Sequence, residues 1–437
     1  MDKKYFIETF GCQMNVHDSE KIAGMLRNLG YVEGKSKDES DIIVFNTCCI
    51  RETAETKIMA KIGDTKALKK ANPNLIVVVC GCMTQQKGMA ELLKKRFPFL
   101  SLVIGTHNLE EMEEYIKEQN KKFRSIVWDK EKAIREDIKM YRTSEDNAWV
   151  NIMYGCNNFC TYCIVPYVRG RERSRKIENI AKEVQALVQE NKYKTITLLG
   201  QNVNSYGNDF KDGTNFVTLL KELCKIKGNF KISFMSSHPK DFSFELIDFI
   251  ANNQDKMSIN LHLPAQSGSD EILKRMNRRY TSAHYKELVD YIYKKIPNAT
   301  LSTDIIVGFP GETEKDFQDT LELMKYCKFA SVFGFVYSKR QGTPAATFEN
   351  QVLAKTKKER ITRLFELEHS LQKETLKDFV GKTYDAVIVD DDKGNKLAKT
   401  HFNKLIRVDA TNFKIGNEVK VFVEKIENDL LYGKIVD

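Results

Sequence analysis

The sequence predicts an α/β protein of several domains: an N-terminal parallel α/β domain, a central partial (β/α)6 barrel and a small C-terminal β-barrel or sandwich. Three observations predict this class. The 437 residues correspond to about three domains of ordinary size. Apolar strand-like runs alternate with helical stretches through most of the chain, whereas the C-terminal residues contain only short strand-like runs. We place the domains at residues 1–142, 143–376 and 377–437.

The first third has the alternation that is typical of a parallel sheet covered by helices. We expect buried strands at residues 5–10, 41–46, 75–80 and 101–104, and helices at 19–29, 53–70, 85–96 and 109–119. Residues 121–147 are charged and lack a strong period, so we expect a connection there with one edge strand.

A second α/β series occupies the middle of the chain. Its expected strands are 149–154, 195–199, 231–235, 257–263, 300–307 and 330–337, and helices are expected at 180–191, 244–251, 282–295 and 314–326. Six such units predict a partial barrel, with chemistry at the carboxyl ends of the strands. A long helix at 355–379 then leads to short strands at 384–389, 405–409, 418–425 and 430–435.

Composition limits the classes of protein to consider. Hydrophobic residues make up 42% and charged residues 30%, which is an ordinary globular balance. Neither a membrane-spanning run nor a signal peptide is recognisable, so we expect a cytoplasmic protein without a membrane partner. The net charge of +9 fits either a soluble protein that happens to be basic or one with a polyanionic partner such as nucleic acid.

The first specific signal comes from the ten cysteines. In a large chain that is not secreted, thiols stay reduced and suggest metal binding or catalysis. Cys12, Cys48 and Cys82 each follow a different predicted strand. Because ligands gather at the carboxyl ends of parallel strands, these three thiols can converge on one metal centre.

A second group follows the first strand of the central series. Cys156, Cys160 and Cys163 have C-x3-C-x2-C spacing on one short loop. Three thiolates can hold three irons of a 4Fe–4S cube and leave the fourth iron open. The alternative is zinc with a distant fourth ligand, since structural zinc sites have four ligands.

This spacing resembles the signature of the radical S-adenosylmethionine (SAM) superfamily. Cys12, Cys48 and Cys82, the first cysteine trio, narrow the resemblance to the methylthiotransferase family of that superfamily. The resemblance covers essentially the whole chain. Five segments carry it: GCQMN at 11–15, NTC at 46–48, GCM at 81–83, CIVPYVRG at 163–170 and GQNVNSYG at 200–207. The resemblance implies two 4Fe–4S clusters, held by the two trios, and a C-terminal RNA-binding TRAM domain.

The resemblance also implies where SAM binds. It places contacts on the residue between the last two cluster cysteines and at the ends of the barrel strands: Tyr162, Gln201, Asn202, Ser236, His262, Gln266, Asp304 and Gly308. For single residues among them, a packing or structural role stays open. The other cysteines, Cys49, Cys80, Cys224 and Cys327, do not match ligand positions, and we interpret them as small apolar core residues.

Basic residues suggest where RNA binds. Arg169, Arg171, Arg173 and Arg175 recur at every second position, so an extended backbone would project all four guanidinium groups to one side. A solvated run of charge is the alternative. Residues 378–437 contain 10 basic against 11 acidic residues. Lys393, Lys396, Lys399 and Lys404 nevertheless cluster around an expected loop, and we assign RNA contacts to Lys399 and Lys404.

Within the family, these segments match the branch that methylthiolates C2 of an isopentenylated adenosine next to the tRNA anticodon. That reaction uses one SAM to methylate sulfur at the auxiliary cluster and another to generate a radical, so no catalytic side chain is expected beyond the cluster ligands. Expected partners are the tRNA anticodon stem-loop and an electron donor such as flavodoxin or ferredoxin, with a monomeric enzyme. Alternatives are a sister enzyme acting on threonylcarbamoyl-adenosine or a ribosomal protein, an RNA-binding protein with structural metals, and an electron carrier.

Overall fold

A computed structural model describes residues 2–49, 52–118, 122–127, 136, 140–142, 144, 146–392, 395–400, 402, 404–409 and 412–436. Two compact units are present. Unit 1 consists of Met1–Met235 with Ser338–Ala346, and unit 2 consists of Ser236–Tyr337 with Thr347–Asp437. Much of the expected connection at 121–147 lies outside the described residues. The division into three domains stays a prediction.

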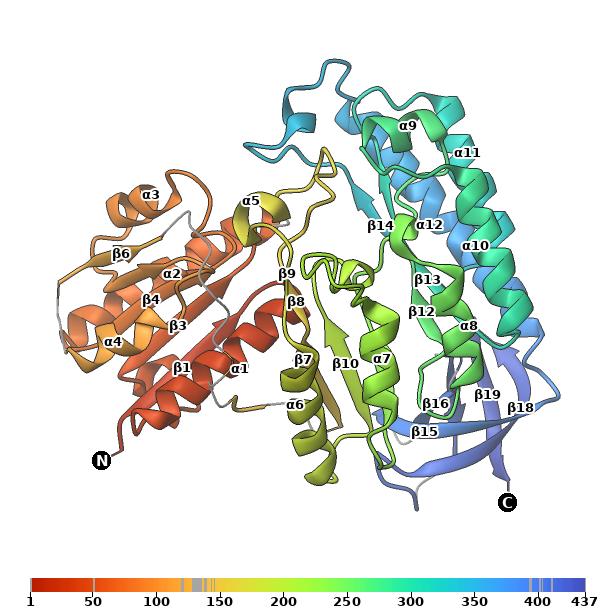
Figure 1. Ribbon diagram of the computed structural model, residues 1–437, viewed down its shortest axis with the longest axis horizontal. Helices are drawn as coiled ribbons and strands as arrows, with labels where there is room; N and C mark the ends of the chain where they lie inside the picture. The colour runs from red at the N-terminus through yellow and green to blue at the C-terminus, as the bar shows by residue number, and fades with distance from the viewer. Residues whose placement is uncertain are drawn as a thin grey trace. The chain divides into compact units, whose positions relative to one another are not determined.

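Unit 1 begins with the expected parallel sheet (Figure 1), whose strand order is β2-β1-β3-β4-β5-β6. Its strands are β1 (Lys4–Thr9), β2 (Val32–Glu33), β3 (Ile42–Thr47), β4 (Ile76–Gly81), β5 (Leu102–Ile104) and β6 (Arg124–Ile126). The sequence indicated β1, β3, β4 and β5 and one edge strand; it missed β2, which is too short to show a period.

Helices cover both faces of this sheet because alternate strand residues point to opposite sides. In β3, Ile42 and Val44 pack with α1 (Gln13–Asn28) and α4 (Glu111–Lys117). Ile43 and Phe45 pack with α2 (Glu52–Ala71), α3 (Met89–Arg96) and the short α5 (Val165–Arg169). The helix α5, which follows the second cysteine trio in the chain, is therefore part of the core of the N-terminal sheet.

A second parallel sheet in unit 1 has the order β11-β10-β7, formed by β7 (Asn147–Asn151), β10 (Thr195–Leu199) and β11 (Lys231–Phe234). The helices α6 (Ile177–Gln189) and α7 (Phe216–Cys224) follow β9 and β10 in the chain. The single strand expected at 149–154 is wrong. The chain turns at Ile152, whose carbonyl accepts from the Arg175 N–H, and β8 (Met153–Tyr154) then pairs antiparallel with β9 (Arg173–Ser174).

Unit 2 contains the parallel sheet β12-β13-β14, formed by β12 (Asn260–His262), β13 (Thr300–Val307) and β14 (Ser331–Val336). Its helices are α8 (Phe244–Asn252), α9 (Asp270–Arg275), α10 (Ser282–Lys295), α11 (Glu314–Cys327) and the long α12 (Ala354–Lys377). Short 3-10 helices occur in both units, at Lys37–Glu39, Val203–Ser205, Pro239–Asp241 and Pro344–Thr347. The six strands of the central series are therefore present, three in each unit.

The C-terminal part of unit 2 is a five-stranded barrel with the order β15-β16-β17-β19-β18, in which β15 also pairs with β18. Its strands are β15 (Thr383–Asp392), β16 (Asn395–Thr400), β17 (Leu405–Val408), β18 (Glu418–Glu427) and β19 (Leu430–Val436). The loop expected around Lys396 and Lys399 is wrong, because both lie in β16. Ala398 between them is buried in the barrel core and pairs with Ile388 and Ile406.

Within the described ranges, no helix is long and apolar enough to cross a bilayer.

Candidate functional site

The first cysteine trio lies at one edge of the N-terminal sheet. Cys12 is the N-cap of α1, Cys48 directly follows β3, and Cys82 directly follows β4. Because β1, β3 and β4 are parallel neighbours, their carboxyl ends meet there. The backbone of Gly11 lies close to Cys48. Gly11 has φ +115°, and an added Cβ there would lie 3.0 Å from Cys48 Sγ. A side chain at this position would collide with the cysteine.

A buried arginine from α5 reaches this edge. Arg169 is 5% exposed, and its Nε donates to Cys82 Sγ at 3.2 Å. One terminal nitrogen donates to Asn15 Oδ1 at 2.8 Å, and the other lies 2.8 Å from Asp18 Oδ2. The sequence placed Arg169 among the RNA contacts; burial in this cluster of partners corrects that expectation. No local pattern in the sequence indicates that Arg169 pairs with Asp18, 151 positions away, although Asn15 ends the GCQMN segment and Asp18 follows it closely.

The thiol of Cys49 is also part of this edge. Its hydrogen bond to Cys82 lowers the pKa of Cys82 to about 6, with the Arg169 charge assisting and burial opposing. The same bond and burial raise the pKa of Cys49 well above its usual value. Cys82 is therefore favoured as a thiolate, which is the form that binds metals. Cys49 belongs to the apolar core as expected, but it is also a donor to a candidate ligand.

The second trio lies on the loop between β8 and α5. The Cys163 N–H donates to the Cys160 carbonyl at 2.9 Å, which closes a turn and brings these two residues together. The Cys156 N–H donates to the Gly170 carbonyl at 3.0 Å. Gly155 has φ +75°, and an added Cβ there would lie 1.9 Å from the Arg171 carbonyl oxygen, so only glycine fits.

The donor set of each trio fits an iron–sulfur cluster. Clusters of this kind take cysteine thiolates, and a cube binds each one at a different iron. Among the described residues, no three His, Cys, Asp or Glu side chains surround a space for a single metal ion. Cys48, Cys82, Cys156 and Cys160 are buried, whereas Cys12 and Cys163 are half-buried.

Three of the residues expected to contact SAM lie in unit 1. The Gln201 side-chain oxygen accepts from the Gly155 N–H, which ties the end of β10 to the cysteine loop. Asn202 is buried beside it, and its carbonyl accepts from Ser205 Oγ at 2.9 Å. Tyr162 is half-buried between the last two cysteines, and the carbonyl of the preceding Thr161 accepts from the Ala345 N–H.

The remaining expected SAM contacts lie in unit 2. His262 ends β12, where Nδ1 is 2.9 Å from Ser302 Oγ and Nε2 is 3.6 Å from Asp304 Oδ2. Gln266 is 7% exposed with φ +67°, and its backbone bonds to β13 on both sides. Its side-chain oxygen is buried and accepts no hydrogen bond from the described residues. A buried oxygen without a partner is suited to accept a hydrogen bond from a bound ligand.

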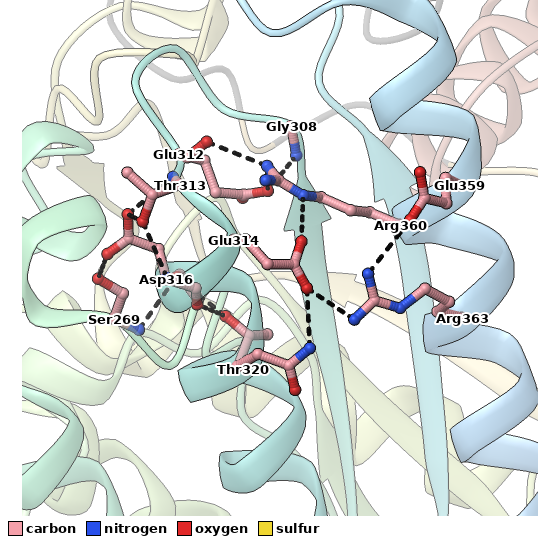
Figure 2. Close-up of polar contacts among 12 residues, drawn as sticks. Ser269, Gly308, Glu312, Thr313, Glu314, Asp316, Thr320, Glu359, Arg360 and Arg363 are labelled. Carbon is pink, nitrogen blue, oxygen red and sulfur yellow. Dashed lines mark hydrogen bonds and ion pairs between the residues drawn. The ribbon is translucent and has the colours of Figure 1, made fainter.

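The loop after β13 is fixed by a buried ion pair (Figure 2). Glu312 accepts the Gly308 N–H at 2.9 Å and pairs with Arg360 of α12 at 2.7 Å. Burial raises the pKa of Glu312, although the Gly308 N–H and Arg360 oppose it. Gly308 has φ +72°, and an added Cβ would lie 2.3 Å from Lys357 Cγ. Ser236, the first residue after the 231–235 segment, also has a positive φ, +67°.

The expected single face of arginines does not form. Arg169 ends a helix, Arg171 lies at a bend, and the only strand in this run is Arg173–Ser174. Arg175 is 6% exposed and pairs with Glu183 at 2.8 Å and Glu136 at 3.0 Å. Arg171 is exposed over the Phe159 ring, and Arg173 is half-buried near Tyr154. Arg171 and Arg173 are thus the members of the run nearest to solvent.

In the C-terminal barrel, Lys399 is exposed on β16. Lys404 is half-buried, and burial lowers its pKa although Glu368 opposes the shift. Lys396 pairs with Asp391 across the β15–β16 hairpin. Lys393, the fourth member of the expected cluster, lies outside the described residues.

Family profiles match both the N-terminal sheet and the central series of strands, and related proteins match nearly the whole chain. A profile described as the radical SAM superfamily matches residues 150–324, and one described as uncharacterized protein family UPF0004 matches residues 4–105. A protein from Clostridium botulinum strain Hall named tRNA-2-methylthio-N(6)-dimethylallyladenosine synthase is 50% identical over 436 residues, covering 99% of this chain and 96% of that protein. Proteins of the same name from Clostridium novyi and Desulforamulus reducens are 47% identical, over 100% and 99% of this chain and 97% and 96% of their own lengths.

Solved structures share the fold at low identity. The radical SAM methyltransferase TsrM from Kitasatospora setae has a TM-score of 0.56 at 12% identity, covering 79% of this chain and 77% of that one. The cobalamin-dependent SAM radical enzyme OxsB has a TM-score of 0.54 at 12% identity, covering 97% of this chain and 65% of its own. Together, the two cysteine trios, the radical SAM match and relatives about half identical over nearly the full length show that this chain belongs to the methylthiotransferase family of radical SAM enzymes.

Proposed function

We propose that this chain adds a methylthio group to C2 of N6-isopentenyladenosine next to the tRNA anticodon, giving 2-methylthio-N6-isopentenyladenosine. One observation carries the proposal: the match to relatives named for this product extends over 99% of the chain at 50% identity. A match of that extent spans the segments that contain both cysteine trios. The C2–H bond offers neither an acidic proton nor a leaving group, so acid–base side chains alone would not suffice.

The radical SAM family implies a 4Fe–4S cluster and SAM. We assign the cluster to Cys156, Cys160 and Cys163, and when bound it supplies the electron that cleaves SAM. We assign a second 4Fe–4S cluster to Cys12, Cys48 and Cys82. The lowered pKa of Cys82 supports this assignment, because a ligand thiol must be deprotonated.

The residues that bind SAM in this proposal hold groups rather than react. The unpartnered oxygen of Gln266 and the ring of His262 beside Asp304 are suited to accept from and orient a polar ligand. Gly308 allows a close backbone approach. We assign the remaining contacts to Tyr162, Gln201, Asn202 and Ser236. The bond from Gln201 to Gly155 suggests that Gln201 also positions the cysteine loop.

We propose that tRNA contacts Arg171, Arg173, Lys399 and Lys404. Arginine over an aromatic ring, as Arg171 lies over Phe159, can also stack on a base. The proposal includes a flavodoxin- or ferredoxin-like electron donor, a monomeric chain and a cytoplasmic location. We also propose that the chain is divided into three domains, at residues 1–142, 143–376 and 377–437.

Mass spectrometry of tRNA nucleosides tests the reaction and the substrate together. A host lacking its own enzyme would express this chain, a Cys160→Ala variant or an empty plasmid. We expect the methylthio-isopentenyl nucleoside only in the host that expresses the unaltered chain. The two controls should contain the isopentenyl nucleoside without a methylthio group. A methylthio group on threonylcarbamoyl-adenosine instead would show that the substrate is that of a sister enzyme. Unchanged nucleosides from a chain that contains iron would contradict the proposal.

A further inference from the structure

Helix α5 joins the two cysteine trios physically. It begins two residues after Cys163, and the apolar side chains of its N-cap, Ile164, and of Val168 pack in the same core as Cys82 and Met83. The Thr106 hydroxyl donates to the Val168 carbonyl at 2.6 Å, which adds a polar contact from the segment after β5. The last residue of the helix, Arg169, therefore reaches the first trio from a rigid support.

The guanidinium of Arg169 is held by three partners from the N-terminal sheet domain. It donates to Cys82 Sγ at 3.2 Å and Asn15 Oδ1 at 2.8 Å, and it pairs with Asp18 at 2.8 Å. Asp18 is 3% exposed, so the two charges compensate each other away from water. A buried arginine with fixed donors has one orientation, because its planar fork must satisfy all three partners.

The backbone beside Arg169 is bonded to the second trio. The Gly170 carbonyl accepts from the Cys156 N–H at 3.0 Å. A short path therefore leads from Cys156 through Gly170 and Arg169 to the sulfur of Cys82. All of its members lie in unit 1.

We propose that Arg169 is a positioning residue that fixes the Cys156 loop to the Cys82 site and places a positive charge and an N–H donor beside the Cys82 sulfur. The inference rests on the proposed function, because it takes Cys82 to be a cluster ligand. Hydrogen bonds to cluster sulfur and nearby positive charge favour the reduced state, so they raise the reduction potential. Arg169 thereby sets the electronic state of the site that it anchors.

The test isolates the N-terminal site in a full-length chain carrying Cys156→Ala, Cys160→Ala and Cys163→Ala. In this parent we compare Arg169→Gln, Arg169→Lys and the control Lys176→Gln, which removes an exposed charge nearby. After anaerobic reconstitution, iron content and a reductive titration followed by electron paramagnetic resonance are measured. At a fixed potential, we expect Arg169→Gln to lower the ratio of reduced to oxidised cluster about tenfold, a shift of about 59 mV.

We expect Arg169→Lys to recover part of this shift, because it keeps the charge without the forked donors. Lys176→Gln should behave as the parent. Since Arg169→Gln leaves Asp18 buried and unpaired, Asp18→Asn with Arg169→Gln is a further variant that avoids this charge. The double variant should shift the ratio in the same direction but by less than tenfold, because loss of the nearby Asp18 charge itself favours the reduced cluster, and such a shift would support the proposal.

Parent-like titration of Arg169→Gln, or a double variant whose cluster is reduced more readily than that of the parent, would overturn the inference while leaving the second cluster in place. Loss of iron from the Gln, Lys and double variants, with circular dichroism unchanged, would also overturn it. Arg169 would then be required for the cluster to bind, and not for setting its reduction potential. If the parent itself binds no iron, the second cluster of the proposed function is wrong, and the inference falls with it.

Discussion

Cys82 shows how far a single ligand depends on its neighbours. Its sulfur accepts from Arg169, its pKa is lowered to about 6 chiefly by Cys49, and Gly81 before it has φ +93°. An added Cβ at Gly81 would lie 2.3 Å from the Thr47 carbonyl oxygen, so β3 and β4 can approach here only with glycine. Arg169, Cys49 and Gly81 thus prepare the ligand, and the spacing of the cysteines reveals none of these three roles.

At the scale of single residues, Cys160→Ala and Cys48→Ala should separate the two sites. We expect Cys160→Ala to abolish SAM cleavage and retain about four irons per chain, because the first trio is intact. Cys48→Ala should keep SAM cleavage and lose the methylthio product. Iron analysis and chromatography of 5′-deoxyadenosine check both results, with Cys224→Ala at the end of α7 as control. Equal loss of SAM cleavage in both variants would contradict separate sites.

At the scale of elements, α11 begins with a capping box. Thr313 Oγ1 accepts from the Asp316 N–H at 3.2 Å, and Asp316 accepts from the Thr313 N–H at 2.8 Å and Ser269 Oγ at 2.5 Å. Burial acts to raise the pKa of Asp316, but bonds from Ser269 and Thr313 outweigh it and lower the pKa below 3.8. The ionised form therefore stabilises the fold above pH 3.8, and this contribution is lost as the pH falls through the folded pKa.

Asp316→Asn should accordingly cost about 1 kcal/mol at neutral pH and progressively less below pH 3.8. Hydrogen exchange of the first amides of α11 measures the local opening free energy. Thr281→Ser, at the cap of α10, is a control that keeps a hydroxyl acceptor. A deficit that stays constant on acidification would show that the carboxylate charge is not what stabilises this cap.

The strand β16 supports a prediction about tRNA. Lys399 projects from it into solvent, whereas Lys425 at the end of β18 is paired with Glu427 at 2.6 Å. If Lys399 contacts a phosphate, Lys399→Ala should weaken tRNA binding and reduce the slope of log affinity against log salt by about one. Lys425→Ala should leave the slope unchanged. Filter binding over a range of salt concentrations decides, and equal slopes for both variants would remove Lys399 from the interface.

At the scale of the whole molecule, all six candidate cluster ligands lie in unit 1, and the cysteine of unit 2, Cys327, is buried in α11. Removal of iron should therefore raise hydrogen exchange in unit 1, around the carboxyl ends of β1, β3 and β4 and in the 156–163 loop. Peptides from the C-terminal barrel should not change. Mass spectrometry would measure hydrogen exchange of these peptides in the iron-loaded chain and in the chelator-treated chain. Equal deprotection of both units would show that the clusters stabilise the entire chain.

The sequence predicted features whose cause is local, and missed those that depend on distant partners. The strands and the cysteines that follow them are visible because apolar runs and spacing are local patterns. The burial of Arg169 depends on Asp18, and the strand β16 depends on pairing with β15 and β17, despite the lysines that favour a loop. The break at Ile152 likewise follows from a bond to Arg175, on another segment.

The Cys49–Cys82 contact has a practical consequence for handling this protein in air. Two thiols that already share a hydrogen bond, one of them disposed to ionise, are well placed for oxidation to a disulfide once iron is lost. Such a cross-link would remove a sulfur that the cluster needs and block its re-entry. Chains purified aerobically should therefore regain full iron loading only after treatment with dithiothreitol, whereas a Cys49→Ser chain should not require it.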